Sequence, residues 1–187
     1  MADEPSPLTG APETGDAPRQ EIYRIDVVSD THGTLPAAVW RACAGADLIV
    51  HAGDICGDGI LDELELQAPV IAVLGNNDWP GQYGPDVIDR IDFERLGVTF
   101  RVAHIPSHLG GLEGVRVAIC GHTHVARVER VGSTTIVNPG STTRPRGAGR
   151  RPTMARVTIG QNYVRSVQLL ALDDARDEMV PMPAPVS

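Results

Sequence analysis

Short apolar runs separated by polar loops make up the first half of the chain from residue 22 onward. Three of these runs are rich in β-branched residues and have the length of buried strands, at residues 22–29, 47–51 and 70–74. Between them, residues 35–44 and 60–66 have the spacing of short helices. The pattern predicts three units of strand, loop and helix, whose strands run parallel because each crossover returns the chain to the same edge of the sheet.

Each of these predicted strands ends in a polar cluster. The three clusters are Asp30-Thr31-His32, Gly53-Asp54 and Gly75-Asn76-Asn77-Asp78. Ligands of open α/β sheets gather at the carboxyl ends of the strands. We therefore expect the three clusters to lie together.

The second half of the chain has weak helical periodicity and several hairpin signals. Strands are predicted at residues 93–96, 98–103, 115–120, 125–131, 134–137, 154–159 and 163–172, with residues 79–90 as a loop. We expect this half to be antiparallel. The predicted fold is α/β, with two mixed β-sheets packed as a sandwich and flanked by helices.

The predicted domain covers residues 21–172. Residues 1–20 are rich in Pro, Gly, Ala and acidic residues and are predicted to be a disordered leader. Residues 173–187 are predicted to be a loose C-terminal tail.

Two imidazoles, those of His122 and His124, follow the apolar run 115–120 directly and need partners of matching chemistry. Such partners follow or end the other apolar runs, so the full set of candidate metal ligands is Asp30, His32, Asp54, Asn76, His104, His122 and His124. All offer oxygen or imidazole nitrogen, which suits manganese, iron, nickel or zinc. A single four-coordinate ion would leave three of the seven candidate ligands unused, whereas two ions that share a carboxylate would use all seven.

The composition says more about the cellular compartment of the protein than about its function. The formal net charge is −8, but residues 1–21 and 173–187 hold nine of the 24 acidic residues, so the central part is nearly neutral. Three scattered cysteines do not suggest a disulfide framework, and neither a signal peptide nor an apolar run of about 18 residues is found. We expect a cytoplasmic protein with no membrane contact. With 4% aromatic residues, nucleic-acid binding through base stacking is not supported.

The motifs D-x-H, GD, GNND, a later His and GHTH, in this order, resemble those of the calcineurin-like metallophosphoesterases. The short bacterial and archaeal phosphodiesterase branch is the most similar part of that family. The resemblance covers roughly residues 22–172 and implies a pair of mixed sheets flanked by helices. It also implies a hydrolase that cleaves phosphodiesters through a metal-bridging hydroxide, with two divalent ions of which manganese is the preferred assignment.

Carried over to this sequence, the family pattern divides the ligands between two metals. It assigns one ion to Asp30, His32, Asp54 and His124. It assigns the other to Asp54, Asn76, His104 and His122, so that Asp54 bridges.

The sequence departs from the family pattern in two places. Many relatives have a His after the Asn, where this chain has Asn77, and an amide cannot act as a general acid. We therefore expect substrates whose leaving group needs little protonation, or an acid from elsewhere, for which His108 is the candidate. In addition, only 18 positions separate His104 from His122, so a short loop is expected where relatives often have a helix.

Several other residues are candidates for catalysis or substrate binding. Asn77, Asp78 and His108 are the candidate catalytic residues, and Asn77, Ser141 and Arg144 the candidate substrate contacts. Asp78 could equally cap its loop, and Asn138 to Ser141 could be plain turn chemistry. Arg144 begins an Arg-rich stretch that ends at Arg156 and could steer an anion, although such arginines are also commonly just solvated. His51, inside an apolar run, is expected to be packed rather than catalytic.

Other functions remain open at this stage. The partner expected is a small phosphate ester, and a homo-oligomer is compatible with the sequence. A phosphomonoesterase acting on small activated esters is one alternative. A non-catalytic interaction module, as in a retromer subunit of this fold, is another, and a protein with a single structural zinc is a third.

Overall fold

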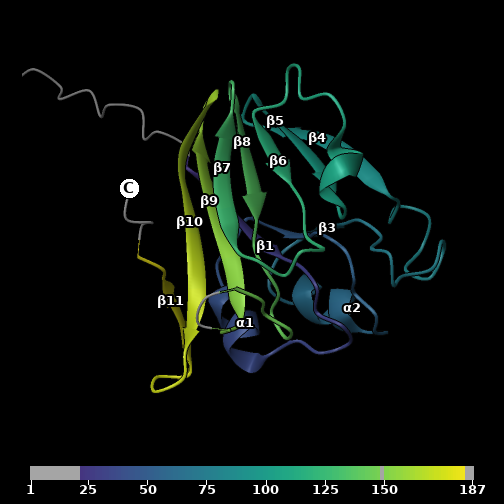
Figure 1. Cartoon of the computed structure of the whole chain (residues 1–187), viewed down its shortest axis with the longest axis vertical. Coiled ribbons are helices and arrows are strands. Elements are labelled where there is room, and N and C mark those ends of the chain that lie inside the picture. The colour runs from purple at the N-terminus through teal and green to yellow at the C-terminus, as the bar shows by residue number, and fades with distance from the viewer. Residues whose placement is uncertain (1–21, 148–149, 184–187) are drawn as a thin grey trace, which may run out of the picture.

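The structure, a computed structural model, describes residues 22–147 and 150–183. The leader predicted at residues 1–20 lies outside the described residues. The described part of the chain forms two mixed sheets that pack face to face (Figure 1).

The first sheet has the strand order β11-β10-β9-β1-β2-β3. Its strands are β1 (Tyr23–Val28), β2 (Leu48–His51), β3 (Val70–Ala72), β9 (Thr153–Gly160), β10 (Tyr163–Asp173) and β11 (Glu178–Pro181). β1, β2 and β3 are parallel, as the three predicted units require. The hairpin of β9 and β10 joins this sheet antiparallel to β1.

The second sheet has the order β4-β5-β6-β8-β7. Its strands are β4 (Arg90–Arg95), β5 (Val98–Ala103), β6 (Val117–Ile119), β7 (Arg127–Val131) and β8 (Thr134–Asn138). The prediction of an antiparallel half is wrong here, because β5, β6 and β8 run parallel and only β4 and β7 are antiparallel to their neighbours. The crossovers between these parallel strands contain no α-helix, so they give no helical pattern to read.

The core lies between the sheets and beneath the helices. Ile25 and Val27 of β1 pack in one apolar cluster with Phe100 and Ile119 of the second sheet. Val28, next in sequence, faces the opposite way, toward helices α1 (Ala37–Ala42) and α2 (Ile60–Glu65). Both faces of β1 are therefore buried, which explains why residues 22–29 read as a nearly continuous apolar run. No helix in the described part of the chain is long and apolar enough to cross a membrane.

The outer face of the second sheet is covered by a short connection instead of a long helix. The 3-10 helix η1 (Pro106–Leu109) follows β5, and Leu109 packs with Ala118 and Cys120 on this face. The short loop predicted between His104 and His122 is therefore present, and α1 and α2 flank only the first sheet.

The C-terminal segment differs from the prediction of a loose tail at residues 173–187. Glu178–Pro181 form β11, which pairs antiparallel with β10. Met179 packs against the cluster that contains α1, and Arg41 of α1 donates a hydrogen bond to the Asp177 carbonyl at 2.7 Å. Residues 184–187 lie outside the described residues.

Replacing Met179 by Ala should lower the free energy of unfolding by about 1–2 kcal/mol, because the side chain is partly buried against the helical core. Glu178→Ala, at the exposed neighbouring position, is the matched control and should leave stability unchanged. Urea unfolding followed by circular dichroism measures both. Equal stability of the two variants would contradict a docked β11.

Candidate metal centre

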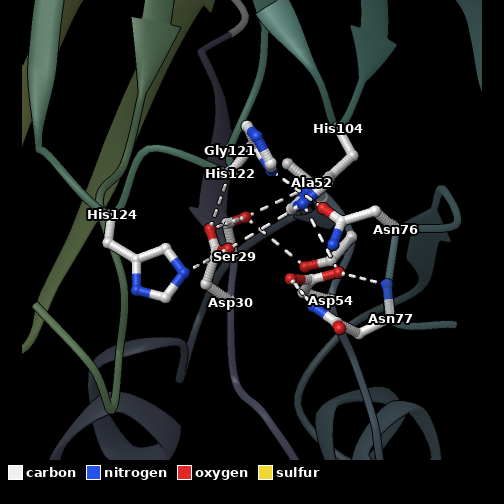
Figure 2. Close-up of polar contacts among 12 residues, drawn as sticks. Ser29, Asp30, Ala52, Asp54, Asn76, Asn77, His104, Gly121, His122 and His124 are labelled. Carbon is white, nitrogen blue, oxygen red and sulfur yellow. Dashed lines mark hydrogen bonds and ion pairs between the residues drawn. The ribbon is translucent and has the colours of Figure 1, made fainter.

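The seven candidate ligands all follow strands, and the sheet topology brings the ends of those strands together. Asp30 and His32 follow β1, Asp54 follows β2, and Asn76 follows β3. His104 follows β5, while His122 and His124 follow β6. A hydrogen bond joins ligands that follow strands of different sheets, since the His122 backbone N–H donates to Asp30 Oδ2 at 3.2 Å (Figure 2). The expectation that these clusters lie together is confirmed.

The backbone at five of these residues is in the left-handed region, a conformation that residues other than glycine rarely adopt. The φ values are 53° at Asp30, 46° at His32, 54° at Asp54, 67° at His122 and 60° at His124. In both the D-x-H and the H-x-H motif the two residues that carry this conformation are the candidate ligands. Such strain clusters at functional sites, where the surrounding fold holds it in place.

The first group of ligands consists of Asp30, His32, Asp54 and His124. Each offers one ligand atom such that all four atoms lie within 4.8 Å of one another. His124 Nε2 lies 3.1 Å from Asp30 Oδ1 and 3.3 Å from His32 Nε2. This spacing suits a metal ion held between the side chains.

The second group lies on the other side of Asp54. His104 Nε2 is 3.4 Å from Asp54 Oδ1, and His122 Nδ1 is 2.8 Å from Asn76 Oδ1. The rings of His104 and His122 are 5.3 Å apart and nearly perpendicular. His104 is 2% exposed, whereas Asn76 and His122 are exposed. This group therefore forms the solvent side of the cluster.

Two of the imidazole rings are oriented by hydrogen bonds from Nδ1–H to backbone carbonyl oxygens. Nδ1–H of His104 donates to the Ala52 carbonyl at 2.7 Å, and Nδ1–H of His124 donates to the Arg144 carbonyl at 2.7 Å. A carbonyl can only accept, so Nδ1 of each ring carries a proton, and in the neutral ring the lone pair is on Nε2, which faces inward. Metal-binding histidines are commonly oriented in this way.

The interior of the cluster has polar atoms that lack partners. Among the described residues, buried Asp30 Oδ1 and His104 Nε2 accept or donate no hydrogen bond. Burial raises the pKa of Asp30 above its ordinary value, against the lowering effect of Ser29 and the nearby histidines. A divalent cation would satisfy both orphaned atoms and favour the ionised carboxylate, so the residues present fit metal ions.

Asp54 is held in the ionised form by its surroundings. Burial alone would raise its pKa, but the His104 ring beside it and the hydrogen bonds from Asn77 place the pKa well below the usual range. Asn77 donates twice, from its backbone N–H to Oδ1 at 2.9 Å and from Nδ2 to Oδ2 at 2.7 Å (Figure 2). Asn77 therefore orients Asp54, which the sequence did not reveal.

Asp78, predicted as catalytic, is an anchor for the loops instead. It is 8% exposed, and its Oδ2 accepts N–H groups of Ile55 at 3.1 Å and Gly75 at 2.8 Å. Its Oδ1 accepts the Cys56 N–H at 2.8 Å and the Tyr83 hydroxyl at 3.2 Å. With both oxygens engaged, Asp78 ties the loop after β2 to the loop after β3. This is the capping role that the sequence left open.

Ser141, predicted as a substrate contact, is buried and already fully bonded. Its hydroxyl donates to the Asp30 carbonyl at 2.8 Å and accepts the N–H groups of Thr143 at 3.2 Å and Arg144 at 2.8 Å. The prediction of a substrate contact is therefore corrected to a turn residue that supports the backbone of Asp30.

The two charged candidates at the rim differ. The Arg144 side chain is exposed, and its positive charge is close enough to His32 to add to the effect of burial in lowering that histidine's pKa. His108 is exposed in η1, and within the described residues its side chain makes no hydrogen bond or ion pair with the cluster. Arg156, at the far end of the Arg-rich stretch, is bonded to buried Asp26 at 2.8 Å. Arg144 is thus the better placed of these side chains to meet an anion.

His51 is packed, as predicted. It is fully buried, accepts the Gly53 N–H on Nδ1 at 3.2 Å, and bonds Thr31 through Nε2 at 3.0 Å. Burial lowers its pKa to about 4, so the ring is neutral. It supports the loops that carry Asp30 and Asp54.

Sequence reasoning missed Ser29 and Cys56 as parts of the site. The Ser29 hydroxyl donates to Asp30 Oδ2 at 2.6 Å, and Cys56 Sγ lies 3.6 Å from His32 Nδ1. Both are neighbours of a ligand motif in the sequence, which is the only signal that could have found them.

Position 121 has no room for a side chain, so glycine is required there. A Cβ at this position would overlap Ser29 Oγ and lie 2.8 Å from Asp30 Oδ2. Gly121→Ala should therefore lower stability by about 1–3 kcal/mol and reduce metal content, because Asp30 must move. Gly111→Ala is the control, since there the nearest atom is the end of the Glu113 side chain. Thermal unfolding and metal analysis of both variants test this, and unchanged metal binding by Gly121→Ala would contradict it.

Comparison with known proteins agrees with this geometry. Residues 23–162 match the family model described as the calcineurin-like phosphoesterase superfamily domain. The site and the two mixed sheets define a metallophosphoesterase, and the chain belongs to the calcineurin-like phosphoesterase superfamily.

An archaeal and a bacterial protein are among the relatives of this chain. A probable metallophosphoesterase of Methanocaldococcus jannaschii is 36% identical over 134 residues, which are 65% of this chain and 69% of the relative. The phosphodiesterase YfcE of Escherichia coli is 28% identical over 152 residues, covering 67% of this chain and 83% of YfcE. The solved structure of vacuolar protein sorting 29 from Cryptosporidium parvum has a TM-score of 0.70 at 18% identity, over 86% of this chain and 97% of that one. At that identity the last likeness concerns the fold alone.

Proposed function

We propose that this protein is a dinuclear-metal-dependent hydrolase that cleaves phosphodiesters. The observation that carries the proposal is the position of Asp54 between the two ligand groups. Its Oδ2 lies 3.8 Å from His32 Nε2, and its Oδ1 lies 3.4 Å from His104 Nε2. The two oxygens of one carboxylate thus face different groups, an arrangement in which Asp54 can bridge two ions.

The proposed ligand sets follow from this division. Asp30, His32, Asp54 and His124 would hold one ion, and Asp54, Asn76, His104 and His122 the other. The oxygen and imidazole donors favour manganese among the candidates, with iron, nickel or zinc as the other choices. The chemistry that such ions supply when bound is a lowered pKa for water and neutralisation of charge on phosphoryl oxygens.

The chain's own residues would orient the site and the substrate. Asn77 fixes the direction of both Asp54 oxygens, and the carbonyls of Ala52 and Arg144 fix the rings of His104 and His124. The exposed guanidinium of Arg144 would attract the substrate phosphate. Since all three cysteines are unpaired, we place this activity in the cytoplasm.

The direct test is hydrolysis of two nitrophenyl esters by the manganese-loaded protein. We expect bis-p-nitrophenyl phosphate to be cleaved faster than p-nitrophenyl phosphate, and a chelator to abolish both reactions. Faster cleavage of the monoester would favour the phosphomonoesterase alternative. No turnover of either ester at any manganese concentration would contradict a hydrolase.

The rate should depend steeply on the leaving group, because Asn77 cannot donate a proton to it. We expect diesters with alkyl leaving groups to react far more slowly than nitrophenyl diesters. Asn77→His should narrow this difference, since an imidazole can protonate a poor leaving group. A series of diesters with graded leaving-group pKa measures the slope for both forms, and equal slopes would contradict the role given to position 77.

A further inference from the structure

A groove of about 620 Å³ lies along β3, away from the candidate metal ligands. β3 is the edge strand of the first sheet, opposite β11 (Figure 1). One wall is α2, and the other is formed by residues 82–87 and by Ile91 of β4. The apolar lining comes from Leu61, Val70, Ile71, Val87 and Ile91. We call this feature the β3 groove.

Beyond Ala72 the edge of β3 is covered, since Val73 bridges Ile88 in parallel and Leu74 N–H donates to the Ile88 carbonyl at 3.0 Å. At residues 70–72 the edge faces the groove. Ile49 N–H donates to the Pro69 carbonyl at 2.9 Å, and Val73 N–H donates to the His51 carbonyl at 3.1 Å. In a parallel ladder with this register, alternate residues bond to β2, so Val70 and Ala72 direct their N–H groups away from β2. Within residues 22–147 and 150–183, neither N–H makes a hydrogen bond. Ala72 lines the groove but is only 5% exposed, so its N–H group lies at the bottom of the groove.

The rim of the β3 groove is acidic. Asp58, Asp62, Glu65 and Asp86 line it and are exposed, and no Arg is among the lining residues. Asp62 and Glu65 stand on α2, while Asp86 stands on the opposite wall, so negative charge borders the groove on both sides.

We propose that the β3 groove binds an extended segment of a partner protein in which apolar and basic side chains alternate. Such a segment adds to β3 as a further strand and satisfies the free N–H groups of Val70 and Ala72. Alternate side chains of a strand point to opposite faces. One set therefore packs on the apolar lining, while the other reaches the carboxylates of the rim.

Charge argues against two other occupants. A second copy pairing through the same edge would bring Glu65 and Asp86 near their own equivalents, and like charges across such an edge repel. Residues 1–21 of this chain carry five acidic residues and one Arg, so they have the wrong sign for the rim.

The test uses a synthetic peptide of alternating Val and Arg and measures its binding to the full chain by fluorescence anisotropy. A second peptide has the same sequence with an N-methyl group on every peptide nitrogen, which removes the donors from both edges of the strand but keeps the charge. We expect the first peptide to bind at least about tenfold more tightly than the second, because only the first can pair with β3. Hydrogen exchange of the Ala72 amide should slow on binding.

Charge reversal on both walls provides the matching protein variants. Glu65→Arg with Asp86→Arg should weaken binding of the first peptide by about tenfold. Asp174→Arg with Glu178→Arg changes the net charge equally at exposed positions outside the groove and should have no effect. Removal of metal by a chelator should leave binding unchanged, so this result is independent of the hydrolase assay.

Three results would overturn the proposal. They are equal binding of the N-methylated peptide, equal weakening by the two charge-reversed proteins, and unchanged exchange of the Ala72 amide in the complex. Self-association that Glu65→Arg with Asp86→Arg abolishes would instead identify a second copy as the occupant.

Discussion

Asp54→Ala should reduce hydrolysis of bis-p-nitrophenyl phosphate by about a thousandfold or more and should release metal from both positions. The reason is that the Asp54 carboxylate faces both ligand groups with separate oxygens, through Oδ2 toward His32 and through Oδ1 toward His104. Metal content by mass spectrometry and steady-state kinetics measure the two effects together.

Asp58→Ala is the matched control for Asp54→Ala. Asp58 lies four residues further along the same loop and is exposed, so its loss should change neither metal content nor rate. If Asp54→Ala kept two ions per chain and a normal rate, Asp54 would not bridge.

Asp78→Ala should lower the free energy of unfolding by about 3–5 kcal/mol, since three backbone N–H groups and the Tyr83 hydroxyl would lose their acceptor. Metal affinity should fall as well, because the loops that carry Asp54 and Asn76 are no longer joined. At saturating manganese, however, kcat should recover to within about tenfold of the unaltered protein, as expected of a positioning residue.

Asp86→Ala serves as the control for Asp78→Ala. Both residues lie in the stretch after β3, but Asp86 is exposed. Denaturant unfolding and metal titration of the two variants should differ clearly. A large loss of kcat in Asp78→Ala that saturating manganese does not restore would return Asp78 to the catalytic residues.

The ligand-bearing part of the fold could be predicted because it depends on local sequence patterns, namely apolar runs that are followed by polar motifs. β1, β2 and β6 are buried, so they appear as apolar runs, and the ligand motifs stand where those runs end. The parallel order of β1, β2 and β3 followed from the helices between them. The convergence of the motifs then needed only the rule that ligands gather at the carboxyl ends of strands.

The parts that were not predicted depend on long-range pairing. β4 begins at Arg90 instead of residue 93, because two of its first three residues are charged and β4 is an edge strand. β11 has only four residues and is defined by its pairing with β10. The parallel arrangement of β5, β6 and β8 depends on how the chain crosses between them, and those crossovers carry no helical periodicity.

The roles of polar residues were hardest to predict, since they depend on burial. Asp78 and Ser141 stand in motifs that suggest chemistry, yet their side-chain oxygens already accept hydrogen bonds from neighbouring backbone N–H groups. Asn77 was expected to matter as a replacement for a proton donor, and its two bonds to Asp54 could not be read from the sequence. The identities of neighbouring residues do not show which hydrogen-bond acceptors are already satisfied.

The central claim is that Asp54 lies between two metal ions. The most direct test is anomalous diffraction from crystals of the manganese-loaded protein, collected at the manganese edge. The account predicts two peaks about 3.5–4 Å apart, one beside His32 and His124 and the other beside His104 and His122. A single peak, or two peaks that do not flank the Asp54 carboxylate, would contradict it.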